Sequence, residues 1–177
     1  AVEKVKDLLQ QSEYLVQPLL IDHQTLAQLA QCCRTDAEAI TLRILTRRRQ
    51  QQYTVVCAYL EIPLQDTHHR RHAFIAIDKN RGALQPAGDN WHYRLLQQYC
   101  APLLQAADGM AIPWWQDIKN YAVNAHQLTS DINVVAWDFI ITDQGPLLLE
   151  GNINWRVSAP QILFGPLQPL LHSEPMD

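Results

Sequence analysis

Glycine is scarce in this sequence, with six residues in a chain of 177. The glycines are scattered, so the chain has no glycine-rich loop of the kind that wraps around phosphates. Cysteine pairs with zinc-ligand spacing are also absent: the four cysteines include the adjacent Cys32 and Cys33 but no CxxC motif. We therefore predict free thiols in a reducing compartment rather than a zinc site or a disulfide framework.

Excess positive charge and long apolar runs are lacking as well. The chain carries 14 basic and 18 acidic residues, a formal net charge of −4, which gives no reason to expect a nucleic-acid partner. No apolar stretch approaches the roughly 20 residues that a membrane-spanning helix needs. The charged first residues do not form a secretory signal. We predict a soluble, cytoplasmic protein without a membrane span.

Hydrophobic periodicity predicts an α+β protein. Helical spacing covers residues 2–11, 23–32 and 114–128. Alternating, β-branched segments predict strands at 14–16, 40–46, 53–62 (ended by Pro63), 73–77, 134–142 and 147–150, and a turn at 78–82 leads into 83–85. The Pro-rich segment beyond Asn154 is expected to form a short helix or tail. Hairpins between successive strands favour a largely antiparallel sheet with flanking helices. The length of 177 residues and the 47 % hydrophobic content suit a single domain over residues 1–177.

The segment from Asp138 to Arg156 carries the side chains with the clearest chemical meaning. Asp138 lies on one strand of a predicted hairpin and Glu150 ends the other, with Gly145 suited to a positive φ in the turn. Glu150 and Asn152 are two residues apart, so in an extended chain they point to the same face. Two carboxylates and an amide oxygen that converge form a ligand set suited to Mg²⁺. An ordinary hairpin with exposed acids at its ends is the alternative.

Arg43 and Arg156 are candidate partners for an anion. Arg43 shares one face of its predicted strand with Thr41 and Leu45. An arginine among apolar neighbours needs an anionic partner, either a phosphate or the carboxylate of a structural salt bridge. Arg156 fits equally a clamp on a phosphate or substrate carboxylate and an arginine at the rim of a site.

Other conspicuous residues have structural interpretations. His126 is interpreted as a satisfied structural histidine rather than a catalyst, and Trp114 and Trp115 as core residues. The basic clusters 47–49 and 68–72 lie between apolar runs. An exposed hairpin tip is favoured for each over a phosphate-binding patch.

Three short motifs carry a resemblance to a known family. Residues 136–138 (AWD), 142–146 (TDQGP) and 149–152 (LEGN) resemble the closing motif of ATP-grasp proteins, most closely the sugar-transfer-associated ATP-grasp group. In that family the aspartate, glutamate and asparagine of the motif bind the magnesium ions that bridge the phosphates of ATP. The resemblance therefore implies this role for Asp138, Glu150 and Asn152.

Further segments match the family in the same order along the chain. Residues 14–18 resemble the linker strand whose backbone meets the adenine edge, and a polar pair follows at 22–23. Residues 41–46 resemble a strand whose arginine faces the phosphates, which implies a catalytic role for Arg43. The nucleotide-binding residues that the resemblance implies are Val16, Gln17, Leu19 and Asp22.

The resemblance implies the C-terminal part of an ATP-grasp fold, with ATP and Mg²⁺ as cofactors. In full-length form, such a protein would be an ATP-dependent carboxylate–amine ligase. It would activate a small-molecule carboxylate as an acyl-phosphate for attack by an amine or similar nucleophile, with Arg156 near the substrate. The group's association with sugar transfer hints at modification of cell-surface polysaccharide. A non-catalytic nucleotide-binding or interaction module is the alternative.

The chain departs from the family at its N-terminal side. ATP-grasp sites are completed by lysines and a glycine-rich loop from a smaller subdomain that precedes the linker strand. The only lysines before Tyr14 are Lys4 and Lys6, and the chain begins without methionine. We expect the chain to be a piece of a longer protein, without the N-terminal lysine-bearing subdomain. By itself this piece is expected to be inactive and to bind nucleotide weakly.

Overall fold

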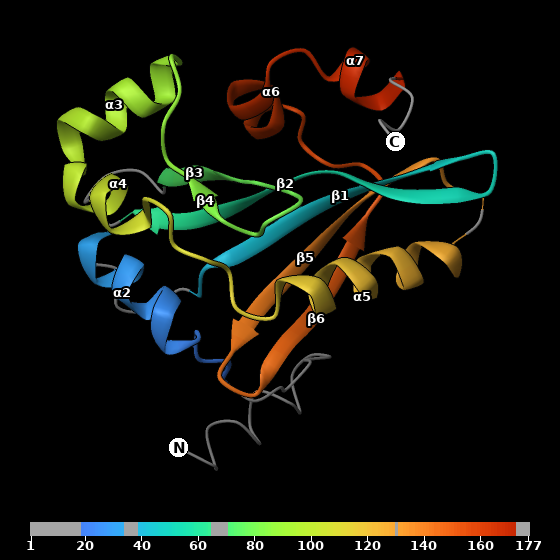
Figure 1. Cartoon of the computed structure of the whole chain (residues 1–177), viewed down its shortest axis with the longest axis horizontal. Helices are drawn as coiled ribbons and strands as arrows, with labels where there is room; N and C mark the ends of the chain where they lie inside the picture. Colours follow the sequence, from blue (N-terminus) through green and yellow to red (C-terminus); the bar gives the residue numbers. More distant parts are fainter. Residues whose placement is uncertain (1–18, 34–38, 65–70, 130, 173–177) are drawn as a thin grey trace, which may run out of the picture.

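A six-stranded antiparallel sheet forms the centre of the computed structural model, which describes residues 19–33, 39–64, 71–129 and 131–172 (Figure 1). The strand order is β4-β3-β2-β1-β5-β6. The strands are β1 (Thr41–Arg49), β2 (Gln52–Leu64), β3 (Arg71–Ile77), β4 (Leu84–Gln85), β5 (Val134–Thr142) and β6 (Gly145–Asn152). Each neighbouring pair is antiparallel, so the expected α+β fold with a largely antiparallel sheet is confirmed.

Helices pack on both faces of this sheet. They are α2 (Gln24–Cys33), α3 (Trp91–Tyr99), α4 (Ala101–Ala107), α5 (Trp115–Gln127), α6 (Ser158–Phe164) and α7 (Leu167–His172). Buried residues of α2, α3, α4 and α5 join the larger core cluster, whereas α6 and α7 join a smaller cluster. Figure 1 shows α6 and α7 together at the top of the view, separate from α2 and α5.

Alternation along β1 divides its side chains between these two clusters. Leu42 and Ile44 are fully buried in the larger core, and Leu45 is fully buried in the smaller one. Arg43 lies between Leu42 and Ile44 and so shares the face of Leu45, as the alternation predicts. We call the face of the sheet that carries Arg43, Leu45 and Asp138 the site face.

The periodicity does not predict α3 and α4, which are the main departure from the expected fold. Both helices are short, so each offers too few turns for a clear apolar stripe. Helix α3 closes the edge of the sheet beyond the end of β4. The Phe74 amide donates to His92 Nε2 at 2.9 Å, and the Ala76 amide donates to Tyr93 Oη at 3.0 Å.

The expected exposed hairpin tip at residues 47–49 holds for Arg49, which is exposed beside the turn, but not for Arg47, because β1 continues to Arg49. The turn is formed by Gln50 and Gln51, with φ of 47° and 67°. Two consecutive positive φ values are typical of the two-residue turns that match strand twist. Arg47 is buried, and its Nη1 donates to the carbonyl of Leu170 on α7 at 3.3 Å.

Two smaller expectations also fail. The strand 53–62 does not end before Pro63, because β2 runs to Leu64 and Pro63 pairs with His72. Its neighbour β1 begins opposite Glu61, so Pro63 lies at a free strand edge where a missing N–H is tolerated. Trp115 is buried as expected, but Trp114 is 44 % exposed.

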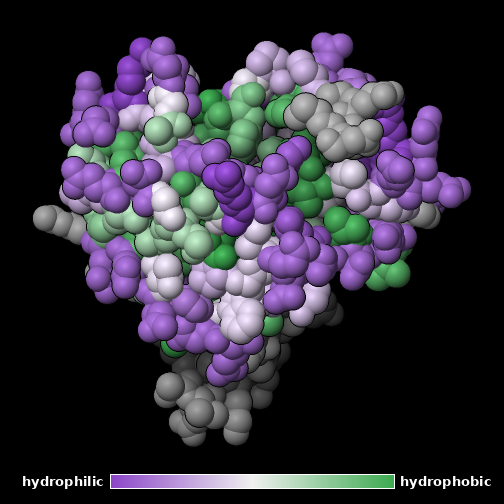
Figure 2. All heavy atoms as spheres, viewed as in Figure 1, coloured by the Kyte–Doolittle hydropathy of each residue, from purple (hydrophilic) through white to green (hydrophobic). Residues whose placement is uncertain are grey.

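Several predicted features lie outside the described residues, namely the helix 2–11, the strand 14–16 and most of the basic cluster 68–72. In the described ranges, no helix is both long enough and apolar enough to span a membrane. Hydrophilic side chains cover most of the molecular surface visible in Figure 2.

Candidate metal centre

Three neighbouring strands bring the candidate residues together on the site face. Asp138 of β5 is paired with Glu150 of β6 on one side and with Arg43 of β1 on the other. Asn152 follows two residues after Glu150, opposite Ala136. Gly145 has the positive φ, +129°, that the sequence favours in the β5–β6 turn.

The polar groups of these residues are in direct contact. Asn152 Nδ2 donates to Glu150 Oε1 at 2.9 Å and to Asp138 Oδ2 at 3.2 Å. Arg43 Nε donates to Asp138 Oδ1 and Arg43 Nη2 to Asp138 Oδ2, both at 2.6 Å. The structure therefore places the two carboxylates and the amide on one surface, and their role as metal ligands stays a prediction.

Burial differs strongly across this group. Asp138 is only 5 % exposed, Arg43 and Asn152 are half-buried, and Glu150 is exposed. The hydrogen bonds to Asp138 raise the pKa of Arg43 above its ordinary value, against the opposing effect of desolvation. Arg43 is therefore a permanent cation that neutralises a buried carboxylate.

Tyr59 belongs to this group too, although sequence reasoning did not single it out. It lies opposite Arg43 on β2 and is 1 % exposed, close enough that each side chain affects the pKa of the other. Burial raises the pKa of Tyr59, which keeps the phenol neutral beside the guanidinium. The alternation of β2 puts Tyr59 on one face of that strand, but only the pairing with β1 reveals its neighbour.

Gly151 has a steric reason to separate Glu150 from Asn152. It pairs with Trp137, and an added Cβ would overlap ring atoms Cζ3 and Cε3 of that tryptophan. The ring cannot move freely, because Trp137 Nε1 donates to Thr46 Oγ1 at 2.8 Å. Close approach of backbone and ring requires glycine here.

The oxygen atoms of these side chains are of the kind that magnesium prefers, although both oxygens of Asp138 accept from Arg43 in this structure. Nδ2 of Asn152 lies between two carboxylates, where a positive group is favoured, and rotation of the amide would present Oδ1 in its place. The described residues hold no group of three or more His, Cys, Asp and Glu that could bind a metal. Two carboxylates and one amide would leave the remaining positions of Mg²⁺ to phosphate and water, as is usual for this ion.

The implied nucleotide-binding residues are only partly described. Val16 and Gln17 lie outside the described residues, and Leu19 is 87 % exposed. Asp22 accepts from the Ile40 amide with both carboxylate oxygens, at 3.2 and 3.0 Å, which ties the segment before α2 to the start of β1. Burial raises the pKa of Asp22. Arg156 is exposed in the connection between β6 and α6.

His126 has the structural role that the sequence favours. It is fully buried, and its Nε2 lies 3.0 Å from the Ile132 carbonyl, which can only accept. Nε2 therefore carries the proton, and Nδ1 accepts from Thr46 Oγ1 at 2.7 Å. Both ring nitrogens are used inside the protein.

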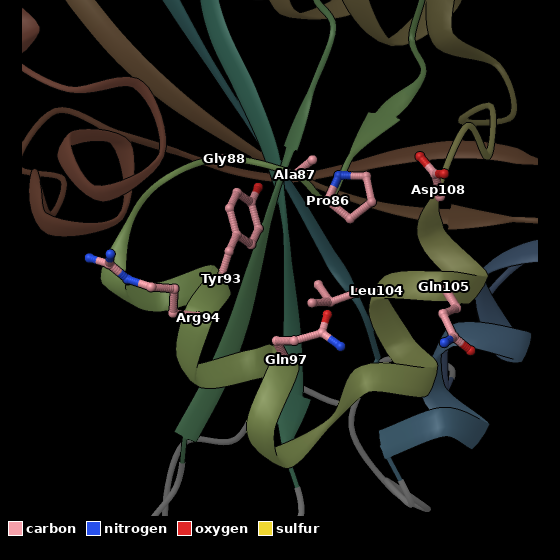
Figure 3. A pocket seen from close by; sticks show the side chains of 9 residues that line it. All are labelled: Pro86, Ala87, Gly88, Tyr93, Arg94, Gln97, Leu104, Gln105 and Asp108. Carbon is pink, nitrogen blue, oxygen red and sulfur yellow. The ribbon is translucent and has the colours of Figure 1, made fainter.

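A surface depression of 410 Å³ lies elsewhere in the molecule (Figure 3). It is bordered by the segment after β4, by Tyr93 and Gln97 of α3, and by Leu104 and Gln105 of α4. None of the candidate site residues lines it. The depression is therefore separate from the candidate site formed by Arg43, Asp138, Glu150 and Asn152.

Comparison with known families identifies the class of protein. The family model described as sugar-transfer associated ATP-grasp matches residues 8–171, which is most of the chain. The chain belongs to this ATP-grasp family. No curated protein and no solved structure gives a significant match. Membership supports an ATP-binding, ligase-like module that acts on small molecules.

Proposed function

We propose that Asp138, Glu150 and Asn152 hold Mg-ATP on the site face, as the nucleotide-binding part of a ligase. The complete enzyme would activate a carboxylate as an acyl-phosphate, which an amine or similar nucleophile then attacks with loss of phosphate. Association of the family with sugar transfer favours acceptors from cell-surface polysaccharide.

The contact of Asn152 with both carboxylates carries the proposal. Its amide nitrogen donates to both Glu150 and Asp138, beside the half-buried cation of Arg43. Bound magnesium would supply charge neutralisation at the ATP phosphates. Arg43 would contact the transferred phosphoryl group, where a guanidinium fork matches phosphate oxygens. The protein would thus act mainly by positioning and electrostatics.

The remaining candidate residues complete the proposed arrangement. Val16, Gln17 and Leu19, together with the segment held by Asp22, would seat the adenine, in line with the family resemblance. Arg156 would bind an anionic group of the substrate near the end of β6. The supporting observation is its exposed position four residues beyond Asn152 in the chain.

Calorimetric titration with Mg-ADP tests the proposal. We expect a measurable heat for the native chain and at least a tenfold weaker affinity for Asp138→Asn and Glu150→Gln, because each removes a charged metal ligand. Asp117→Asn, an exposed change of the same type on α5, should bind like the native chain. Equal heats for all four proteins would refute the metal site.

A non-catalytic nucleotide-binding module is the second candidate, and the observation that bears on it is the position of the described lysines. Apart from Lys4 and Lys6, lysine is found only at Lys79 and Lys119. Lys119 lies on α5 with its Nζ 5.9 Å from the centre of the Trp115 ring, within the region of the larger core. Neither described lysine belongs to the contact network of Asp138, so neither would contact a phosphate bound there.

A further inference from the structure

Arg43 holds the carboxylate that the proposed metal would need. Both Asp138 oxygens accept from the guanidinium at 2.6 Å, and Oδ2 also accepts from Asn152. The fork of Nε and Nη2 is the bidentate geometry in which arginine–carboxylate pairs are strongest. In this state Asp138 is already neutralised, and Glu150 alone has no cationic partner among the contacts of this group.

A divalent cation by itself therefore meets a blocked ligand. To coordinate Asp138 fully, it has to displace a permanent cation that lies beside it. The displaced guanidinium would remain half-buried, with side-chain exposure of 17 %, next to a metal ion of like charge. Tyr59, its other neighbour, is held neutral by burial and cannot replace the lost carboxylate. An unpaired buried charge is strongly unfavourable.

A phosphate oxygen removes this conflict. It offers Arg43 an anionic partner of matching fork geometry and at the same time offers the metal an oxygen ligand. We infer that Arg43 is a gate: it blocks Asp138 against free divalent cations and releases it when a nucleotide phosphate takes over the guanidinium. The inference rests on the proposed function and adds that metal and nucleotide bind interdependently.

This role gives Arg43 an effect on metal binding that a simple phosphate contact would not have. Removing a phosphate contact should weaken nucleotide binding and leave the metal unaffected. Removing the gate should also tighten the binding of metal alone, because Asp138 then lacks a competing cation. Thermodynamic linkage requires that the promotion of metal binding by nucleotide equals the promotion of nucleotide binding by metal.

The test is titration of the chain with Mn²⁺, which suits the same oxygen ligands, with free Mn²⁺ measured by electron paramagnetic resonance. Each protein is titrated without nucleotide and with ADP at a fixed concentration. The variants are Arg43→Gln and Arg43→Lys, with Arg48→Gln as the matched control. Arg48 lies on the same strand on the opposite face, so the control carries the same change of charge and size. Chelation of Mn²⁺ by ADP in solution is common to all proteins and cancels between them.

We expect Arg43→Gln to bind Mn²⁺ alone about tenfold more tightly than the native chain, which corresponds to release of a hydrogen-bonded charge pair. The increase produced by ADP should shrink to that degree or vanish. Arg43→Lys, which keeps the charge but lacks the fork, should lie between. Arg48→Gln should match the native chain. The comparison with Arg43→Lys decides the matter if circular dichroism shows that Arg43→Gln does not fold.

Two results would overturn the gate. One is weaker or unchanged Mn²⁺ binding without nucleotide in both Arg43 variants. The other is an equal effect of ADP in the native chain and in both variants. If either result is found while Asp138→Asn and Glu150→Gln still abolish Mn²⁺ binding, the metal centre stands and only the gate fails. Mn²⁺ binding that is absent from the native chain and from both Arg43 variants, with and without ADP, overturns the proposed function and the gate together, and so does Mn²⁺ binding that is unaffected by Asp138→Asn and Glu150→Gln.

Discussion

The contacts of Asp138 show how single residues set the properties of the site. Its carboxylate is 5 % exposed and is stabilised by Arg43 and Asn152 together. Loss of either partner leaves a buried charge with fewer donors, which is more costly than loss of an exposed ion pair. The side-chain contacts of Asp138 thus come from two other strands, β1 and β6.

Gly151 leads to a prediction at the same scale. We expect Gly151→Ala to lower the free energy of unfolding by about 1–3 kcal/mol, the usual cost of overpacking. The added methyl group would meet the Trp137 ring and displace Glu150 and Asn152 on either side. Urea denaturation measures the loss of stability, and the Mg-ADP titration should show weaker binding.

A double-mutant cycle provides the control for this prediction. Trp137→Leu removes the ring that the new methyl group would strike. Gly151→Ala should therefore cost clearly less in that background than in the native chain. Identical costs in both backgrounds would show that the ring is not the reason for glycine at this position.

Strand β1 links the elements of the protein because both of its faces are used. Leu42 and Ile44 contribute to the larger core, and Arg43 and Leu45 face the other way. Farther along, Thr46 accepts from Trp137 of β5 and donates to His126 of α5. This hydrogen-bonded chain fixes α5 against the sheet behind the candidate site.

His126 makes the attachment of α5 sensitive to pH. Burial lowers the pKa of His126, and likewise that of His92. A depressed folded-state pKa means that the unfolded chain binds more protons, so stability rises with pH through this window. The contribution is complete above the unfolded value of about 6.5 and is lost as the pH falls from there through the lower folded-state pKa.

We therefore expect the urea concentration at the unfolding midpoint to decrease as the pH is lowered from 7.5 to 5.5. His126→Gln should show a smaller fall, because the amide takes up no proton, with a remainder due to His92. His172→Gln, at an exposed position on α7, should retain the full native dependence. A fall of equal size in His126→Gln and the native chain would contradict this role for His126.

The two edges of the sheet differ in how the described residues cover them. At one edge, α3 supplies His92 and Tyr93 as hydrogen-bond partners for β3. At the other, β6 carries consecutive exposed leucines, with 43 % exposure at Leu147, 41 % at Leu148 and 44 % at Leu149. The candidate metal centre lies beside this second edge. A nucleotide there would contact solvent on the side that the described residues leave uncovered.

This exposure leads to a prediction about activity. We expect the 177-residue chain by itself to hydrolyse ATP no faster than the uncatalysed background. The site would neither exclude water nor place a lysine on the phosphates, and both strengthen transition-state electrostatics. Phosphate release, compared with Asp138→Asn as a blank, measures this. Turnover by the native chain that Asp138→Asn abolishes would contradict it and favour a self-sufficient enzyme.

Much of the candidate centre is a property of local sequence. Regular pairing from the turn at Gly145 would put Asp138 opposite Leu149, and a β-bulge between Asp138 and Phe139 brings it opposite Glu150 instead. A spacing of two places Asn152 on the same side as Glu150. The relation between Glu150 and Asn152 follows from backbone geometry alone, whereas the bulge that pairs Asp138 with Glu150 is not predicted by strand alternation. The motif resemblance to ATP-grasp proteins rests on the same short segment, and the family match bears it out.

Tertiary structure decided what the distant partners are. Arg43 and Asp138 are 95 residues apart, and local pattern does not state that β1 lies between β2 and β5. Strand order and helix packing decide several other contacts. They put Asp138 beside Arg43, Arg43 beside Tyr59, and α7 over the buried Arg47, and they bring Asp22 within hydrogen-bond distance of the Ile40 amide. Such contacts depend on the sum of many weak long-range interactions. The sequence by itself therefore defined which side chains share a face within each strand, and the fold decided how the strands are paired and which side chains neutralise one another.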